Sequence, residues 1–186
     1  MRVAKLRTPR TAWIEAALQA LASGGPDAVR VEALAASLGV SKGGFYWHFK
    51  DREALLAEML DSWEQTGTAA VIERVEGEDA AAREKLRLLL ELAPAADFEL
   101  ELAVREWSRR DPALVDRLRR VDERRLRFLR GLFAEFCPRG ADAEARTMLA
   151  YSLLIGSYFV LGGDGSRSRS ELLQLALDRL LDESWT

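Results

Sequence analysis

The sequence predicts an all-α protein of about nine helices, and three observations lead to this fold class. Apolar residues recur at spacings of three and four, as Trp13, Ala17 and Leu21 do, which is the period of an amphipathic helix. The sequence lacks sustained period-two alternation and hairpin dipeptides between β-branched runs, the usual signs of strands. Clusters rich in glycine, proline and aspartate divide the chain into helix-sized pieces.

Three short helices are predicted at the start of the chain. The first runs through "RTAWIEAALQALA" and ends at "SGGPD", where glycines and a proline stop it. The second covers about residues 30–38 and ends at Gly39, a residue suited to a left-handed turn. The third begins at Ser41, whose hydroxyl is expected to cap the helix by accepting from backbone N–H groups.

A long helix and five further helices account for the rest of the chain. Asp51 is expected to cap the long helix, which continues to about Val75. Five breaker clusters then delimit the remaining helices, at about 79–93, 96–109, 112–136, 141–162 and 169–183.

The composition indicates a soluble globular protein. Of the 186 residues, 48% are hydrophobic and 31% are charged, which is the balance of a chain that folds around a core. The longest nearly uncharged run, 147–163, is shorter than the roughly 20 residues of a membrane span. The basic N-terminal residues lack the apolar stretch of a secretory signal. We therefore expect a cytoplasmic protein with no membrane partner.

The residues that usually carry catalysis or bind metal are scarce. A single cysteine, Cys137, and a single histidine, His48, cannot form a disulfide framework or a zinc site of soft ligands. A nucleophile needs a partnered base, and Cys137 has no histidine near it in sequence. Residue 45, three before His48, is Phe rather than the Glu of a di-iron motif. We expect no catalytic residue, metal site or cofactor, and hence not an enzyme.

Charge is distributed unevenly along the chain. Residues 1–52 contain eight Lys and Arg against four Asp and Glu, a balance of +4. The remaining 19 basic and 26 acidic residues give the rest of the chain a balance of −7. A basic N-terminal part on an acidic body suggests that the N-terminal part binds a polyanion, although chance segregation of surface charge would look the same.

The stretch "VEALAASLGVSKGGFYWHF" has the pattern of a helix-turn-helix, whose second helix enters the major groove of DNA. Phe45 and Phe49 are four residues apart and share a helical face, so they are predicted to point inward. The first helix is expected to pack through an inward stripe of Val31, Leu34, Ala35 and Leu38.

The remaining aromatic residues of this stretch suit a nucleic-acid surface. Tyr46, Trp47 and His48 each combine a flat apolar body with a hydrogen-bond donor, which suits contacts with sugars, thymine methyl groups and phosphates. Gly43 and Gly44 each cost about 1 kcal/mol of helix stability relative to alanine, and close approach of the backbone to DNA would compensate. The alternative is that all of these rings form the core of a small bundle.

The segment "RVEALAASLGVSKGGFYWHFKDREALLAEML" resembles, across its whole length, the N-terminal domain of the tetracycline-repressor-like (TetR) transcriptional regulators. The resemblance implies a homodimer with a helix-turn-helix DNA-binding domain at residues 1–52. It also implies a helical domain at residues 53–186 that dimerises and usually encloses a small-molecule pocket. No cofactor is implied.

By position, the resemblance assigns DNA contacts to individual residues. Lys42, Gly43, Gly44 and Trp47 fall where family members approach bases, and Tyr46 and His48 fall where they contact phosphates. The full set of expected DNA contacts is Arg30, Ser41, Lys42, Gly43, Gly44, Tyr46, Trp47, His48 and Arg52. Arg30 and Gly44 depart from the family pattern, which often has Ser or Thr at both positions, and Arg52 stands where many relatives carry lysine.

The late helices are candidates for a dimer interface and a ligand pocket. Small residues and a leucine stripe on the last two helices suggest an interface formed by Ser152, Gly156, Leu172, Leu175, Ala176 and Leu180, with an intramolecular core helix as the alternative. Aromatic and polar residues that could line a pocket are Trp63, Phe98, Glu101, Leu102, Arg105, Trp107, Phe128 and Tyr151, with plain packing as the alternative.

Together these features predict a dimeric DNA-binding transcriptional regulator, acting as a repressor that an unidentified small-molecule effector releases from its operator. The competing interpretation is a helical DNA-binding or scaffold protein without an effector. Release from DNA on addition of a ligand would distinguish the two.

Overall fold

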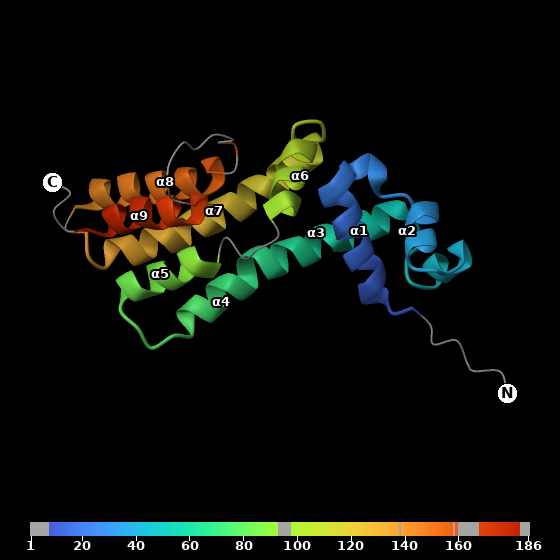
Figure 1. Ribbon diagram of the computed structural model, residues 1–186, viewed down its shortest axis with the longest axis horizontal. Helices are drawn as coiled ribbons and strands as arrows, with labels where there is room; N and C mark the ends of the chain where they lie inside the picture. The colour runs from blue at the N-terminus through green and yellow to red at the C-terminus, as the bar shows by residue number, and fades with distance from the viewer. Residues whose placement is uncertain (1–7, 93–97, 138, 158, 160–167, 183–186) are drawn as a thin grey trace. The chain divides into compact units, whose positions relative to one another are not determined.

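The computed structural model describes residues 8–92, 98–137, 139–157, 159 and 168–182. These residues form nine α-helices, two 3₁₀ helices and one π-helix, and none of them forms a strand (Figure 1). The predicted all-α fold class is confirmed. The chain divides into two compact units, of which unit 1 is Met1–Thr68 with Asp97–Arg119 and unit 2 is Ala69–Ala96 with Arg120–Thr186.

Unit 1 is built around the first helix. Its α1 packs against α2, α3 and α6, and the buried side chains of Trp13, Ala17 and Leu21 repeat at the predicted helical spacing. The elements of this unit are α1 (Arg10–Gly24), η1 (Pro26–Ala28), α2 (Val31–Ser37), η2 (Lys42–Trp47), α3 (Arg52–Glu64), α6 (Phe98–Ser108) and the start of α7 (Pro112–Ala134).

The element after the helix-turn-helix turn differs from the prediction. Gly39 has a φ of 66°, so the left-handed turn is confirmed. The element that follows, however, is the six-residue 3₁₀ helix η2, and the Ser41 side chain makes no capping hydrogen bond. The adjacent Gly43 and Gly44 have low helix propensity, which explains a short 3₁₀ segment in place of an α-helix.

The long helix predicted from Asp51 to Val75 is interrupted. It begins as expected, because the Asp51 carboxylate accepts a hydrogen bond of 2.8 Å from the Ala54 backbone N–H. A π-helix, η3 (Gln65–Ala69), then separates α3 from α4 (Ala70–Glu76). Gly67 within this segment weakens the α-helix, and a π turn accommodates one extra residue per turn. The count of nine α-helices thus agrees with the prediction although two of the elements differ.

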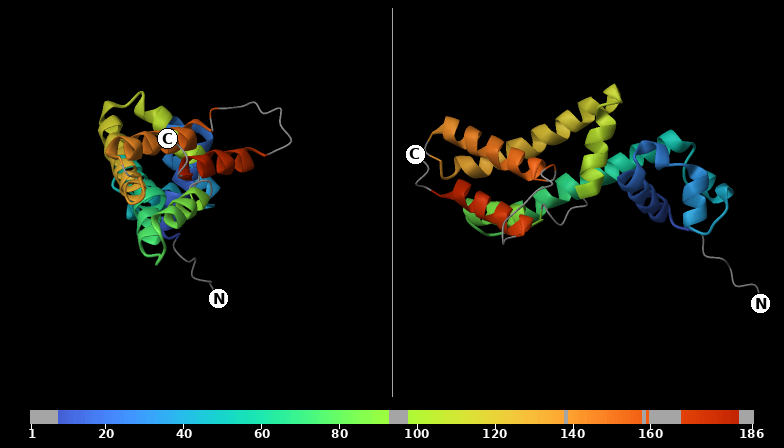
Figure 2. Two further views of the ribbon diagram at one scale, coloured as in Figure 1. Left: turned by 90° about the vertical axis from the view of Figure 1, so that its left-hand side faces the viewer. Right: turned by 45° about the horizontal axis from the view of Figure 1, so that its top comes forward.

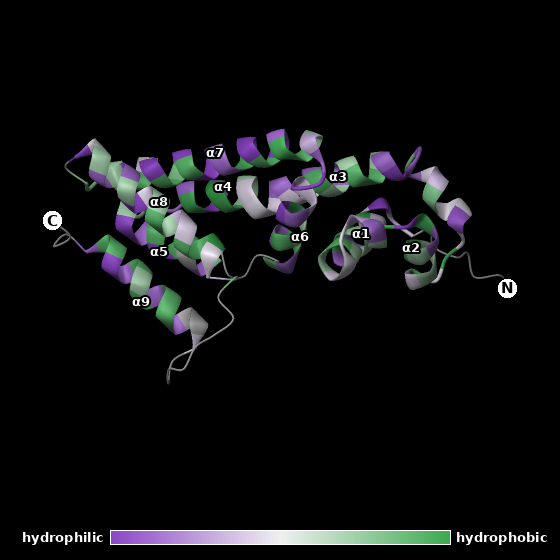
Figure 3. Cartoon of the chain, turned by 90° about the horizontal axis from the view of Figure 1, so that it is seen from above, coloured by the Kyte–Doolittle hydropathy of each residue, from purple (hydrophilic) through white to green (hydrophobic). Residues whose placement is uncertain are grey.

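Unit 2 buries a mostly aliphatic core. Leu86, Leu129, Phe133 and Leu177 are among its most buried side chains. In this unit α9 lies beside α8 and α5 (Figure 2), and its hydrophobic and hydrophilic residues alternate along its length (Figure 3). Its remaining helices are α5 (Ala82–Leu92), α8 (Gly140–Gly156) and α9 (Arg169–Leu181), which begin and end within a few residues of the predicted limits except at the end of α8.

Two further statements apply to the part of the chain that the structure describes. No helix there combines the length and the apolar content needed to cross a membrane. No group of three or more His, Cys, Asp or Glu side chains there is arranged to hold a metal ion. The two compact units do not follow the division at residue 52, because unit 1 also contains α3 and α6. That division remains a prediction about function.

Candidate nucleic-acid interface

Phe45 and Phe49 attach η2 to the core of unit 1. Phe45 is fully buried and Phe49 is 2% exposed, and their rings stack with centroids 5.2 Å apart. The edge of Trp13 in α1 meets Phe45 at a centroid distance of 5.5 Å. The prediction that these two phenylalanines point inward is confirmed.

The neighbouring aromatic residues lie on the surface. Tyr46 is 55% exposed and Trp47 is 72% exposed, which is unusual for rings of this size. The alternative that all rings of this stretch form a core is therefore wrong for these two. Their exposure makes both rings accessible to a partner.

His48 is partly engaged inside unit 1. It is half-buried, and its Nε2–H donates to the carbonyl oxygen of Thr8 at 3.0 Å. A contact from His48 to a phosphate would therefore use Nδ1, which carries a hydrogen only when the ring is protonated or changes tautomer. The predicted phosphate contact of His48 stays a prediction. It requires a hydrogen on Nδ1, whereas the hydroxyl of Tyr46 needs no such change.

Gly43 and Gly44 are not required by the fold. Neither has a positive φ. A Cβ atom on Gly43 would lie 3.7 Å from Ser41 Oγ, and one on Gly44 would lie 3.7 Å from Trp13 Cζ2, both ordinary contacts. The described structure would therefore accept alanine at both positions, and the close approach of DNA to these glycines stays a prediction.

Positive charge near η2 is partly paired. The ammonium group of Lys42 hydrogen-bonds to the carboxylate of Glu32 in α2, and both side chains are exposed. This hydrogen bond raises the pKa of Lys42 and lowers the pKa of Glu32. Arg30, the residue before α2, is exposed and makes no capping hydrogen bond there. Ser41 is exposed as well.

Arg52 has a structural role that the sequence did not indicate. Its Nε donates to the carbonyl of Val29 at 2.7 Å and its Nη2 donates to the carbonyl of Pro26 at 2.5 Å. These bonds tie the start of α3 to the η1 segment. A DNA contact from Arg52 would be made by a guanidinium group already held in place.

Arg10 was missed by sequence reasoning. Its guanidinium lies 5.0 Å from the centroid of the Phe49 ring and pairs with Glu58 of α3. Its side chain is 51% exposed, so it adds a positive charge to the surface next to η2. In the sequence it counted only toward the basic balance of the first 52 residues, because its ring partner is 39 positions away.

The residues predicted to line a pocket divide between the two units. In unit 1, the buried carboxylate of Glu101 accepts a hydrogen bond of 3.2 Å from Trp63 Nε1 and one of 2.8 Å from Arg105 Nε. Leu102 and Trp107 line a hollow of about 500 Å³ that also includes residues from the end of α1 and the η1 segment. Phe98, at the start of α6, is half-buried.

In unit 2, Tyr151 and Phe128 belong to the aliphatic core and its edge. The Tyr151 hydroxyl donates to Asp122 Oδ1 at 2.6 Å, and Phe128 packs against the core. Burial raises the pKa of the nearby Cys137 thiol, which keeps it in its less reactive form. A single pocket formed by all eight predicted residues remains a prediction.

The predicted dimer residues are not all on one surface. Leu172 and Leu175 are 47% and 46% exposed, and Ser152 is exposed, whereas Gly156 and Ala176 are half-buried. Leu180 is 6% exposed and belongs to the core of unit 2, so it is not available to a partner. Met148 and Leu149 of α8, which the predicted set does not include, are exposed as well.

Comparisons with known proteins agree with this geometry. Residues 14–59 match the family model described as bacterial regulatory proteins, tetR family. The match covers most of α1, all of α2 and η2, and the first part of α3. The chain matches none of the curated protein sequences.

Solved structures with the same fold span nearly the whole chain. A transcriptional regulator from Saccharomonospora viridis, in complex with choline, has a TM-score of 0.76 at 22% identity over 94% of this chain and 96% of its own. A TerR/AcrR-family regulator from Aquifex aeolicus has a TM-score of 0.70 at 18% identity over 92% and 97%. AibR, in complex with isovaleryl coenzyme A and operator DNA, has a TM-score of 0.66 at 15% identity over 91% and 96%.

Proposed function

We propose that this chain, a TetR-family DNA-binding transcriptional regulator, is a dimeric repressor that a small-molecule effector releases from its operator. The family is one of non-enzymatic regulators. The observation that carries the DNA-binding part is the contrast within η2, where Phe45 and Phe49 are buried and Tyr46 and Trp47 are exposed. The two buried rings attach η2 to the core, and the two exposed rings face outward.

DNA binding by η2 is tested with paired substitutions at Tyr46. Tyr46→Ala removes the ring and the hydroxyl, and it is expected to weaken binding to a genomic fragment by roughly 1–3 kcal/mol, the worth of a good side-chain contact. Tyr46→Phe retains the ring and removes only the hydroxyl, which separates ring contact from the phosphate contact. Equal affinity of Tyr46→Ala and the unaltered protein, at matched salt, would contradict the proposed interface.

Dimerisation is supported by the aliphatic residues exposed on α8 and α9 of unit 2. Met148 and Leu149 on α8, with Leu172 and Leu175 on α9, are between 43% and 58% exposed. A two-fold dimer would present two η2 elements to half-sites about 34 Å apart, or one turn of DNA. Sedimentation equilibrium at micromolar concentration is expected to give twice the monomer mass of 20.8 kDa. A monomer mass would contradict this part.

Effector control is supported by the position of α6 within unit 1. This helix packs against α1, whose Trp13 contacts Phe45 of η2, and its Glu101 is hydrogen-bonded to Trp63 of α3. A ligand that moves α6 would therefore disturb α1 and, through it, η2. Choline and a short acyl-coenzyme A are the first ligands to test, because fold relatives were solved with them.

The effector experiment compares operator affinity with and without ligand. A repressor of this kind is expected to lose affinity for DNA as ligand is added, since a ligand shifts the protein only by binding its two states unequally. Calorimetry with free and DNA-bound protein gives the two ligand affinities directly. Equal affinities for a ligand that binds would favour a DNA-binding protein without that effector.

A further inference from the structure

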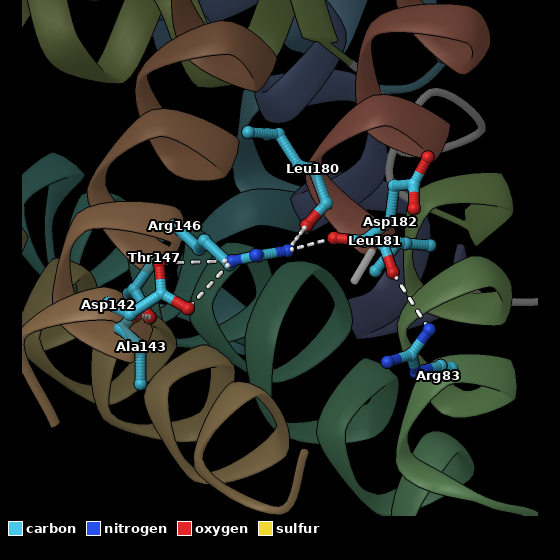
Figure 4. Close-up of polar contacts among 8 residues, drawn as sticks. All are labelled: Arg83, Asp142, Ala143, Arg146, Thr147, Leu180, Leu181 and Asp182. Atoms are coloured by element: carbon cyan, nitrogen blue, oxygen red, sulfur yellow. Dashed lines mark hydrogen bonds and ion pairs between the residues drawn. The ribbon is translucent and has the colours of Figure 1, made fainter. Parts of the chain in front are cut away.

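The two ends of α9 are held in different ways. At its N-terminal end the Ser168 hydroxyl and the Glu171 carboxylate form a capping box, in which each side chain accepts from the backbone N–H of the other residue. At its C-terminal end the last carbonyl groups are satisfied by arginines from other helices of unit 2 (Figure 4). Only the second arrangement fixes α9 relative to its neighbours.

Arg146 of α8 is the centre of this arrangement. Its Nη1 donates to the carbonyl of Leu180 at 2.6 Å and to the carbonyl of Asp182 at 2.8 Å. Its Nε donates to the carboxylate of Asp142, one turn earlier in α8, at 3.2 Å. Figure 4 shows the guanidinium group between this carboxylate and the end of α9.

Arg83 of α5 completes the set. Its Nη1 donates to the carbonyl of Leu181 at 3.0 Å, and its guanidinium lies 4.4 Å from the centroid of the Phe136 ring. The carbonyls of residues 180, 181 and 182 are therefore each bound by an arginine from a helix other than α9. Leu180 and Leu181 lie in the last turn of α9, where a helix leaves its carbonyls without internal partners, and Asp182 is the C-cap residue.

The energetics favour a positioning role for Arg146. The negative end of a helix dipole attracts a cation, and the planar guanidinium binds several oxygens in one fixed geometry. The Arg146 side chain is only 4% exposed, so its charge is desolvated and depends on these partners. Moving α9 by one residue would break them and would turn its exposed face by about 100°.

The exposed face of α9 has charges arranged for self-association. Glu171, Leu175 and Arg179 are four residues apart, share one face and are all exposed. In an antiparallel two-fold packing centred on Leu175, Glu171 of one copy, whose Oε2 accepts from Ser168 in the capping box, would face Arg179 of the other. Leu175 would meet Leu175. An interface between identical surfaces must be self-complementary in this way.

We infer that Arg146 is the residue that positions α9 so that its exposed face and that of α8 form one docking surface for a second copy of this chain. The inference rests on the proposed dimer. Arg146 itself does not contact the partner. It acts through the backbone of α9, with Arg83 in a supporting role.

The test compares the dimer dissociation constants of full-length variants by sedimentation. Arg146→Gln removes the charge and two of the donors, and it is expected to raise the dissociation constant at least tenfold. Arg130→Gln, which removes the same charge from an exposed site on α7, is the matched control and is expected to change it less than twofold. Arg146→Lys retains the charge and is expected to fall between the two.

The outcomes separate the inference from the proposed function. An unaltered chain that sediments as a monomer would contradict the dimer. A dimeric chain in which folded Arg146→Gln associates as well as Arg130→Gln would overturn the inference alone. If Arg146→Gln does not fold, hydrogen exchange of Arg146→Lys decides. Selective loss of protection in α9, together with weaker association, is expected, and unchanged protection and association would overturn the inference.

Discussion

Two surfaces of this chain expose large apolar side chains, and their surroundings differ. On η2 of unit 1 the exposed residues are Tyr46 and Trp47, both with hydrogen-bond donors, beside Lys42 and two glycines. On α8 and α9 of unit 2 the exposed residues are methionine and leucines, which have no donor. Exposure alone would suggest two similar interfaces. From the neighbouring groups we expect instead that the first surface binds a polyanion and that the second binds an apolar protein surface.

The largest effect on stability is expected from truncating Phe45, the buried ring that attaches η2 to the core of unit 1. Phe45→Ala leaves a cavity between Trp13 and Phe49 and is expected to lower the free energy of unfolding by about 3–5 kcal/mol. Denaturant unfolding followed by circular dichroism measures this. Tyr46→Ala, at the exposed neighbouring ring, is the matched control and is expected to stay within about 0.5 kcal/mol of the unaltered protein. If both variants lost a similar free energy of unfolding, the claim that Phe45 supports the fold and Tyr46 does not would be contradicted.

A charge placed on the second surface tests its apolar character. Leu175→Glu buries an unpaired carboxylate at the proposed interface and is expected to weaken dimerisation by about 3 kcal/mol, roughly a hundredfold in dissociation constant. Val115→Glu inserts the same charge at an exposed apolar residue of unit 1 and is expected to leave dimerisation unchanged. Sedimentation equilibrium measures both. Equal effects would mean that the face of α9 is not the interface.

Adding a methyl group to η2, by Gly43→Ala, tests whether its backbone approaches DNA closely. Gly43→Ala should stabilise the folded protein by up to about 1 kcal/mol, because alanine restricts the unfolded chain and meets only an ordinary contact. It should at the same time weaken DNA binding if the backbone approaches DNA there. Gly131→Ala, at an exposed site in α7 with nothing within 4 Å, should stabilise the protein without affecting DNA binding. Unchanged DNA affinity of Gly43→Ala would contradict close approach.

The smallest effect is expected at the Lys42–Glu32 pair. The hydrogen bond lowers the pKa of Glu32 below its usual 4.5 and raises the pKa of Lys42 above its usual 10.5. The contribution of the pair is fully present between these two pH values. It is lost as pH falls through the lowered pKa of Glu32 or rises through the raised pKa of Lys42.

Glu32→Gln should therefore free Lys42 for a phosphate. A modest gain in DNA affinity is expected, with almost no change in stability, because both groups are exposed. Fluorescence anisotropy with a labelled operator fragment measures the gain. Weaker DNA binding after Glu32→Gln would mean that Glu32 orients Lys42 rather than competes for it.

Periodicity in the sequence was sufficient for the features that depend on burial. Spacings of three and four identified α1, and the four-residue spacing of Phe45 and Phe49 identified the inward face of η2. Periodicity cannot distinguish 3₁₀, α and π segments, because the sequence separation spanned by their backbone hydrogen bonds differs by only one residue from each type to the next. This is why the 3₁₀ character of η2 and the π turn of η3 were not predicted.

Contacts to distant backbone groups could not be predicted. Arg52 binds carbonyls 23 and 26 residues away, and Arg146 binds carbonyls 34 and 36 residues away. Any residue type supplies a carbonyl, so the sequence has no pattern that marks the partner. Leu180 was predicted to lie in the dimer interface but is buried in the core of unit 2. Leucines occur on more than one face of α9, so the sequence does not show which of them face a partner.

The salt dependence of DNA binding tests the central claim most directly, which is that the exposed rings of η2 read DNA within a basic surface. The affinity of the unaltered chain for an operator fragment should fall steeply between 50 and 200 mM salt, by roughly 10³-fold or more if about six phosphates are contacted. The double variant Tyr46→Ala, Trp47→Ala should bind at least tenfold more weakly at each salt concentration while remaining folded. An affinity that is insensitive to salt, or a folded double variant that binds as tightly as the unaltered chain, would contradict the account.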